Sequence, residues 1–318
     1  MNTAATAFLF PGQGSQVVGM GKNLFEEFPV ARKTFDEADD ALGKKLSQLC
    51  FEGPEDQLRL TENTQPAILT VSVAAYRVLE EKGVNAGFVA GHSLGEYSAH
   101  VAAGTISFAD AVRTVRNRGK YMQEAVPVGT GAMAAILGMS LDAVGAICGD
   151  AAQGEVCEPA NINSPDQIVI SGHAAAVERA VKLAQERGAK RAILLPVSAP
   201  FHCSLMKPAQ ERLAVDLLKL TFAAPKIPVV CNVYAKPVED AGSSREALVR
   251  QVTGSVNWSD SMQLLITREV QTFVEVGPGK VLCGLMRQID RSKKCMNVED
   301  EASLQKTMEY LSGTTVAS

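Results

Sequence analysis

The sequence lacks the features that anchor a protein in a membrane, direct it to secretion or stabilise a small fold through a set of disulfide bonds. No segment approaches the ~20 consecutive apolar residues of a transmembrane helix. The N-terminal stretch MNTAATAFLFPGQG has neither a basic start nor a long apolar run. The 7 cysteines are scattered, odd in number and without a CxxC pair. We therefore expect reduced thiols, no metal site, no membrane partner and a cytoplasmic location.

A large excess of charge of one sign is also missing. The 31 Lys and Arg residues nearly balance 35 Asp and Glu residues, and the resulting net charge of −4 argues against nucleic acid as a global partner. Hydrophobic residues make up 46% of the 318 positions, an ordinary share for a chain that can bury a full core. The length allows one large domain or a main domain with an insertion.

What is present is a strand–turn–helix signal around residues 87–104. The apolar run FVA at 88–90 indicates the end of a buried strand, GHSLG follows at 91–95, and helical spacing continues to Gly104. Alone, a GxSxG pentapeptide is weak evidence because glycine and serine are common. In this context it is typical of a nucleophile elbow, where strained backbone angles expose the serine hydroxyl. Gly91 and Gly95 would be needed because a Cβ atom would clash. Ser93 is therefore a candidate nucleophile.

The rest of the chain alternates strands and helices, which predicts an α/β fold with a mostly parallel sheet. Strands are expected at 7–10, 88–90, 229–232 and 273–276, with helices at 65–82, 109–125, 244–252 and 259–268. Between Gly129 and Val197 the order changes to β-α-β-β-α-β, as in a ferredoxin-like module. We expect a main domain formed by residues 1–128 and 198–318 and an inserted subdomain formed by residues 129–197.

The helix expected at 109–125 carries a charged residue at an informative place. At about 100° per residue, Arg118 lies at the margin of the inward face, between Val115 and Met122. An arginine there can lay its stem on the core and extend its head into water, or pair with a carboxylate, and the helix alone favours this interpretation. The alternative is a cation held in a pocket for an anionic substrate.

A serine hydroxyl needs a base to accept its proton, and the sequence has 4 histidines. His92 precedes Ser93 and should project away from the apex of the turn, whereas His100 and His173 are expected on helices. His202 follows a strand in the loop SAPFH and is the best-placed partner. The intervening aspartates resemble helix-start or turn residues. If none of them reaches the imidazole, a neutral acceptor such as a backbone carbonyl must orient it.

Seven motifs occur in an order that is informative as a whole. They are FPGQGSQ, TENTQPA, GHSLGEY, RNRGKYMQ, NINSPDQIVISG, the Pro-Phe-His loop and VEVGPGKVL. Together they resemble the malonyl-CoA:acyl-carrier-protein transacylases of bacterial type II fatty acid synthesis, over about residues 6–290. The resemblance implies an α/β-hydrolase-like core with a ferredoxin-like insert, in agreement with the strand and helix pattern.

The resemblance also implies roles for individual residues. Ser93 would accept the malonyl group from coenzyme A as an ester, with His202 as general base and then general acid. The backbone N–H groups of Gln13 and Leu94 would form the oxyanion hole. Arg118 would bind the malonyl carboxylate through a bidentate contact.

Three further residues complete the expected site. Gln251 matches a family glutamine whose main-chain carbonyl orients the histidine. Phe201 resembles the phenylalanine of malonyl-selective members, where the ring fills the space of an α-methyl group, and Leu94 is likewise the malonyl-type residue. Met122, beside Arg118 on the inward helix face, is a further candidate for substrate contact.

Several alternatives stay open. The same serine–histidine pair would serve a hydrolase or thioesterase if water reached the acyl-serine, and an unreactive serine would leave a non-catalytic acyl-binding or scaffold domain. Transfer to a polyketide carrier is a further possibility. The resemblance implies a coenzyme A thioester substrate, no cofactor, a monomer, and an acidic acyl carrier protein as transient partner. A basic rim near the cleft could receive that carrier, formed by Lys190, Arg191, Lys207, Arg287, Arg291, Lys293 and Lys294.

Overall fold

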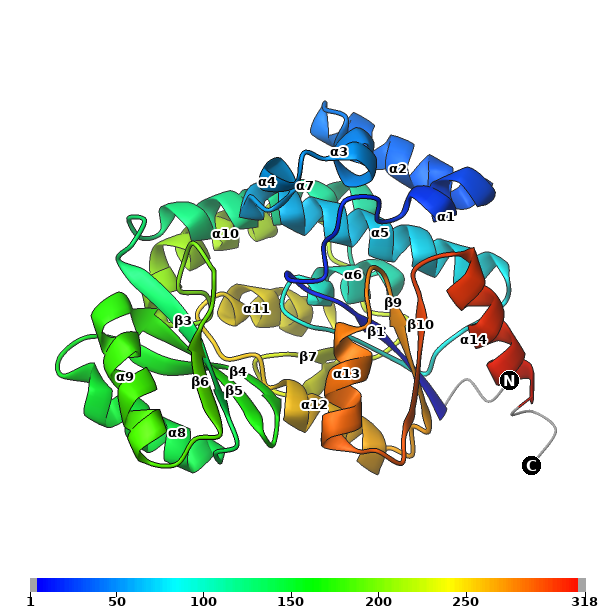
Figure 1. Ribbon diagram of the computed structural model, residues 1–318. Helices are drawn as coiled ribbons and strands as arrows, with labels where there is room; N and C mark the ends of the chain where they lie inside the picture. Colours follow the sequence, from blue (N-terminus) through cyan, green and yellow to red (C-terminus); the bar gives the residue numbers. More distant parts are fainter. Residues whose placement is uncertain (1–4, 314–318) are drawn as a thin grey trace.

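Two sheets organise residues 5–313, the part of the chain that the computed structural model describes (Figure 1). The larger sheet has six strands in the order β10-β9-β1-β2-β7-β8, and all but β8 run parallel to their neighbours. The strands are β1 (Thr6–Phe10), β2 (Phe88–Gly91), β7 (Val229–Cys231), β8 (Lys236–Val238), β9 (Thr272–Val276) and β10 (Lys294–Val298). All of β1 is buried, as expected for a central strand covered on both faces.

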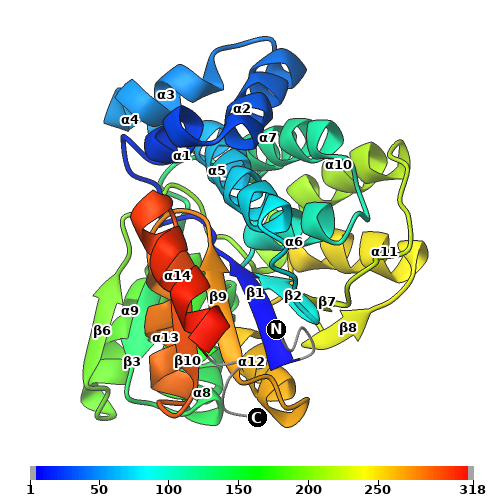
Figure 2. The ribbon, with the colours of Figure 1, turned by 90° about the vertical axis from the view of Figure 1, so that its right-hand side faces the viewer.

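Helices cover both faces of this sheet. On one face lie α2 (Pro29–Leu42), α5 (Thr61–Glu81), α6 (Gly95–Ala102), α7 (Phe108–Glu124), α10 (Lys207–Leu218) and α11 (Ala241–Gln251). The opposite face is covered by α12 (Trp258–Thr267) and α13 (Val281–Ile289). The remaining elements are α1 (Lys22–Glu27), α3 (Leu46–Glu52), α4 (Glu55–Leu58), the 3-10 turn η2 (Ser204–Met206) and α14 (Glu301–Gly313), which packs beside β10 (Figure 2).

The smaller sheet is antiparallel and lies at one end of the molecule (Figure 1). Its order is β4-β5-β3-β6, and two helices cover one of its faces around a separate apolar core. The elements are β3 (Gly131–Leu137), α8 (Leu141–Ala152), β4 (Cys157–Ser164), β5 (Gln167–His173), α9 (Ala174–Glu186) and β6 (Arg191–Leu194). The order along the chain is the β-α-β-β-α-β order expected for residues 129–197.

The helix starts carry capping residues. The hydroxyls of Ser107 and Ser140 accept hydrogen bonds from the third backbone N–H of α7 and α8, and the Asp240 carboxylate does the same for α11. These caps satisfy N–H groups that have no partner inside the helix.

The expectation of an α/β fold with a mostly parallel main sheet is confirmed. Two strands of that sheet, β8 and β10, were not expected from the sequence. Both lie at edges of the sheet, and residues of both are partly exposed. Their sequences therefore lack the continuous apolar run that marked the buried strands.

The expectation that all thiols are reduced is wrong for one pair. Cys283 on α13 and Cys295 on β10 form a disulfide with Cα atoms 5.2 Å apart. The two residues meet because β10 pairs with β9, and α13 begins just after β9. A spacing of 12 residues without a CxxC motif gave no sign of this contact. The remaining 5 cysteines are free and buried.

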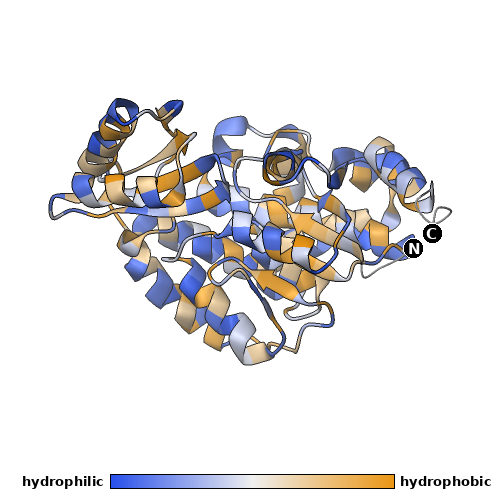
Figure 3. Cartoon of the chain, turned by 90° about the horizontal axis from the view of Figure 1, so that it is seen from below, coloured by the Kyte–Doolittle hydropathy of each residue, from blue (hydrophilic) through white to orange (hydrophobic). Residues whose placement is uncertain are grey.

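Hydropathy follows the layers. Apolar residues gather along the strands in the middle of the molecule, and polar residues lie on the outward faces of the helices (Figure 3). Within residues 5–313, no helix is long and apolar enough to cross a membrane.

Candidate active site

Ser93 lies on a sharp turn between β2 and α6. Its φ angle of 51° is in the left-handed region, which a serine adopts only where the surrounding structure imposes it. A Cβ atom on Gly91 would overlap the backbone of Gly95, and one on Gly95 would overlap the carbonyl oxygen of Phe10. The elbow expected from the sequence is therefore present, and so is the packing reason for its two glycines.

His202 lies directly against the serine. Its Nε2 atom is 2.7 Å from Ser93 Oγ, and its Nδ1 atom is 2.9 Å from the main-chain oxygen of Gln251. A carbonyl oxygen can only accept, so Nδ1 carries the proton and Nε2 is free to accept one from the serine. Burial, reinforced by the positive charge of Arg118, lowers the pKa of His202 to about 3. The imidazole is therefore neutral near pH 7.

Arg118 reaches the same point from α7. It is only 2% exposed, so the interpretation that its head extends into water is wrong. Its Nη2 atom donates to Ser93 Oγ at 3.1 Å and to Gln251 Oε1 at 2.9 Å, and its Nη1 atom donates to Gln65 Oε1 at 2.8 Å. The structure records no ion pair for this guanidinium group within the described residues. A buried cation that forms no ion pair is suited to an anionic ligand.

Two amides in this network were not expected from the sequence. Asn232 holds the elbow, because its Oδ1 accepts from the Ser93 N–H at 2.8 Å and its Nδ2 donates to the Gly91 oxygen at 2.7 Å. Gln65 holds Arg118 and contacts Met122. A signal for Asn232 was available, since it follows β7 and the carboxyl ends of parallel strands meet at one edge. Gln65 lies in the quoted TENTQPA motif, but no residue pattern assigned it a role.

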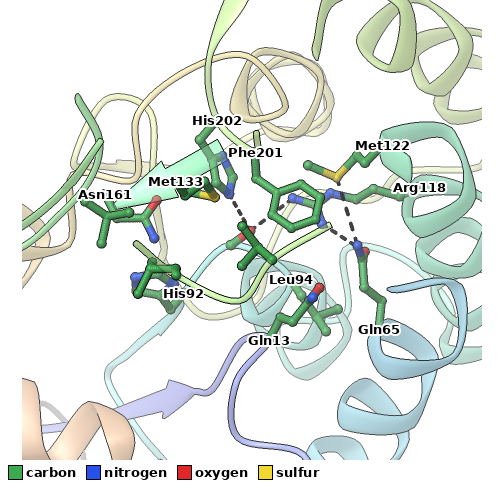
Figure 4. A pocket seen from close by; sticks show the side chains of 14 residues that line it. Gln13, Gln65, His92, Leu94, Arg118, Met122, Met133, Asn161, Phe201 and His202 are labelled. Carbon is green, nitrogen blue, oxygen red and sulfur yellow. Dashed lines mark hydrogen bonds between the residues drawn. The ribbon is translucent and has the colours of Figure 1, made fainter. Parts of the chain in front are cut away.

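A cavity of about 140 Å³ joins these groups (Figure 4). In the figure, Arg118, Gln65 and Met122 lie on one side, and Met133, Asn161 and His92 lie on the other. The cavity is lined by Gln13, Gln65, His92, Ser93, Leu94, Arg118, Met122, Met133, Asn161, Val169, Leu195, Val197, Phe201 and His202. It therefore brings together all the expected site residues except Gln251, which acts from behind His202 and Arg118.

The cavity also shows that the expected direction of the His92 side chain is wrong. His92 does not project away from the site but lines the cavity wall, where its Nε2 atom is 2.8 Å from Asn163 Oδ1. Gln13 has an exposed side chain and also lines a neighbouring groove of about 550 Å³, which shares Val197 with the cavity. The groove and the cavity therefore adjoin at Gln13 and Val197. No group of three or more His, Cys, Asp or Glu side chains in the described part is placed to hold a metal ion.

A serine on an elbow, with a histidine on its hydroxyl and a cation in the same cavity, defines a serine enzyme of acyl transfer. Comparison with known proteins narrows the class. The family model described as "Acyl transferase domain" matches residues 7–309. A "Malonyl CoA-acyl carrier protein transacylase" of Escherichia coli O157:H7 is 54% identical over 284 residues, 89% of this chain and 92% of the relative.

Solved structures agree with this assignment. An acyl carrier protein S-malonyltransferase from Vibrio cholerae has a TM-score of 0.94 and 48% identity, covering 95% of this chain and 99% of that one. A malonyl-transacylase in complex with its type II polyketide acyl-carrier protein has the same TM-score of 0.94 and 48% identity, over 96% and 99% of the two chains. The chain belongs to the malonyl-CoA:acyl-carrier-protein transacylase family, which confirms the resemblance.

Proposed function

We propose that the protein transfers the malonyl group of malonyl-CoA to the phosphopantetheine thiol of an acyl carrier protein, through a malonyl ester of Ser93, for fatty acid biosynthesis. The observation that carries this proposal is the position of Arg118, whose guanidinium group lies 3.1 Å from the oxygen that would carry the acyl group. A hydrolase of neutral esters has no use for a buried cation at that place. An acyl group that ends in a carboxylate does.

The first half-reaction forms the ester. His202 Nε2 takes the proton of the Ser93 hydroxyl as Oγ attacks the thioester carbonyl. Gln251 accepts from Nδ1–H throughout and so stabilises the imidazolium without a buried anion. The imidazolium then gives the same proton to the departing coenzyme A thiolate, the C–S bond breaks, and the malonyl-serine ester remains.

The second half-reaction reverses these steps. The phosphopantetheine thiol gives its proton to His202 and attacks the ester carbonyl. The C–O bond to Ser93 breaks, and His202 returns the proton to the serine oxygen. One thioester is consumed and one thioester is formed overall, so the exchange is close to neutral in free energy and needs no further reactant. We propose that no cofactor or metal takes part.

Two backbone N–H groups would stabilise the oxyanion of each tetrahedral intermediate. Leu94 lies at the start of α6, where unpaired N–H groups and the helix dipole favour negative charge. Gln13 follows Gly12, whose Cα lies so close to the main chain of His92 that a Cβ atom would overlap its carbonyl oxygen. This close approach brings the N-terminal loop alongside the elbow and supports the assignment of Gln13.

Acyl selectivity is proposed to follow from charge and volume. Arg118 favours a free carboxylate, and Gln65 and Gln251 hold the guanidinium group in place. Phe201 and Met122 line the same small cavity, where an α-methyl group would compete with the ring for space. A methyl group contributes only about 1–3 kcal/mol of discrimination, so some transfer of methylmalonyl groups is expected.

The finer description of the fold is also a proposal. We describe the main sheet and its helices, residues 1–128 and 198–318, as α/β-hydrolase-like, and residues 129–197 as an inserted ferredoxin-like subdomain. The separate apolar core between the small sheet and α8 and α9 supports this division. We further propose that the protein acts as a monomer in the cytoplasm.

We propose an acidic acyl carrier protein as the transient partner, docking on the basic rim. Lys190, Arg191 and Arg287 are exposed and have no ion-pair partner recorded in the described part of the chain. Their charges are therefore available to a partner. If docking is electrostatic, the transfer rate falls as ionic strength rises. A rate that does not change with salt would contradict this part of the proposal.

A transfer assay tests the main proposal. Purified protein is given malonyl-, methylmalonyl- or acetyl-CoA, with and without a holo carrier protein, and both acyl carrier and free acid are measured. We expect malonyl transfer that depends on the carrier and little free malonate. Rapid release of malonate without the carrier would indicate a hydrolase instead. Because one similar structure contains a polyketide carrier, comparing fatty acid and polyketide carriers would decide which pathway the protein serves.

A further inference from the structure

Glu96, in the first turn of α6, is a fully buried acidic residue that the proposed reaction does not use. Its Oε2 atom accepts from Gln251 Nε2 at 2.7 Å and from the backbone N–H of Asn232 at 3.0 Å. Its Oε1 atom has no hydrogen-bond partner among the described residues, and no ion pair is recorded for it there. A buried carboxyl group with one oxygen unpaired is costly, so its presence in the folded protein calls for an explanation.

Glu96 Oε2 contacts Gln251, which is hydrogen-bonded to several residues of the site. Gln251 accepts from His202 through its main-chain oxygen and from Arg118 through Oε1. Its Nε2 atom donates to the Ser93 main-chain oxygen at 2.8 Å and to Glu96. One residue therefore connects the base, through its main chain, with the cation and the elbow, through its side chain.

The orientation of the Gln251 amide group matters, because a flip exchanges its oxygen and nitrogen. A flipped amide would set an NH₂ group against the N–H groups of Arg118 and an oxygen against two oxygens. The Ser93 oxygen can only accept. Glu96 Oε2 must also accept, because the backbone N–H of Asn232 that faces it can only donate. Both neighbours thus require NH₂ on their side and leave Oε1 to Arg118.

We propose that Glu96 is a positioning residue that fixes the amide of Gln251, and through it aligns His202 and Arg118 together. The role is one of hydrogen-bond geometry rather than of charge. A proton on Glu96 can reside on the free Oε1, and Oε2 then accepts as before. This inference rests on the proposed malonyl transfer.

Burial raises the pKa of Glu96 to about 7, while hydrogen bonds from Gln251 and Asn232 and the charge of Arg118 act in the opposite direction. The other titratable groups that interact with Glu96 electrostatically are Tyr97 on α6 and Cys231 on β7. Because both protonation states keep Oε2 as an acceptor, positioning should persist as the carboxyl group titrates.

Two substitutions separate reach from charge. Glu96→Gln keeps the length and presents an amide oxygen to Gln251 and Asn232, but removes the charge. Glu96→Asp keeps the charge but is one methylene shorter, so its carboxylate no longer reaches Gln251. Ser98→Ala, which removes a buried hydroxyl without a partner on the same helix, is the matched control.

The experiment measures kcat and KM for malonyl and acetyl transfer, and the rate at which phenylmethylsulfonyl fluoride labels the serine. We expect Glu96→Asp to lower kcat for both acyl groups about 30-fold, raise KM for malonyl-CoA about fivefold and slow labelling about tenfold. Glu96→Gln should stay within about threefold of the wild type in all three, with the same pH profile, and Ser98→Ala within about twofold.

The reverse order, with the Asp variant active and the Gln variant defective, would overturn the proposal in favour of a charge effect. Equal losses in all three variants would also overturn it, since only the packing of α6 would then be at stake. The wild-type assay keeps the two proposals apart. If the wild type transfers no malonyl group, the proposed function fails, whereas the labelling rates still report whether Glu96 aligns His202.

Discussion

The two sheets meet at one cavity but contribute different things to it. The main sheet and its helices supply the polar groups: Ser93 on the elbow, Arg118 on α7, and Gln251 at the end of α11. The small sheet presents mainly apolar side chains, among them Met133 and Val169. We therefore propose that the chemistry is carried by the parallel sheet and its helices, and that the small sheet shapes the space around the acyl group. Substitutions in the main-sheet part and in the apolar wall of the cavity test this division of roles.

The largest effect is expected at the elbow. Gly95→Ala places a methyl group against the carbonyl oxygen of Phe10, and neither backbone can move far, so we expect a loss of more than about 3 kcal/mol of folding stability. Gly145→Ala on α8 of the small unit is the contrast, because no atom beyond the neighbouring backbone of its own helix lies within 4 Å of the added group. That exposed helical position should gain about 0.5–1 kcal/mol. Chemical denaturation measures both. Equal effects would contradict the account of the elbow.

Removing the cation should give the next largest effect. Arg118→Ala should lower kcat/KM for malonyl transfer by about 3 kcal/mol, or about a hundredfold, and lower acetyl transfer far less. Arg113→Ala on the same helix is the control, since Arg113 is exposed, lines neither the cavity nor the groove, and forms an ion pair with Asp110. Arg118→Ala also removes the positive charge that lowers the pKa of His202. The acid limb of the pH profile should therefore move to higher pH. Equal losses for both acyl groups would contradict the proposed binding of the malonyl carboxylate by Arg118.

The burial of Glu96 in the main-sheet part should make the free energy of unfolding depend on pH. The pKa of Glu96 is about 7 in the folded protein and near 4.5 when unfolded. Between these values the folded state binds the proton more tightly, so the stability contributed by Glu96 falls as pH rises. Glu96→Gln does not titrate, and its stability relative to the wild type should rise by about 2 kcal/mol from pH 5 to pH 8. Denaturation at both pH values measures the difference. A constant difference would mean that Glu96 does not titrate in this range.

The apolar wall should give the smallest effect. Phe201→Ala should reduce the preference for malonyl-CoA over methylmalonyl-CoA about tenfold, because the missing ring leaves room for the α-methyl group. Leu137→Ala is the control, since Leu137 packs on the same apolar cluster but does not line the cavity. The preference is measured by direct competition between the two thioesters. A preference unchanged by Phe201→Ala would place selectivity elsewhere.

How much the sequence could predict depended on the range of the interaction. The elbow was readable because strand, turn and helix are continuous in the chain, and the order of elements in residues 129–197 was readable from periodicity. The direction of Arg118 was not, because its partners Gln65 and Gln251 lie 53 and 133 residues away. The Cys283–Cys295 bond joins residues only 12 apart, but it was missed because only the pairing of β9 with β10 brings the two residues together.

The central claim is that the malonyl group passes through the hydroxyl of Ser93. The most direct test is mass spectrometry of the protein after incubation with malonyl-CoA alone, followed by peptide mapping and addition of holo carrier protein. The account predicts one malonyl group per chain, located on Ser93, which disappears as the carrier becomes malonylated. An adduct on another residue, or transfer to the carrier by a Ser93→Ala variant at the wild-type rate, would contradict it.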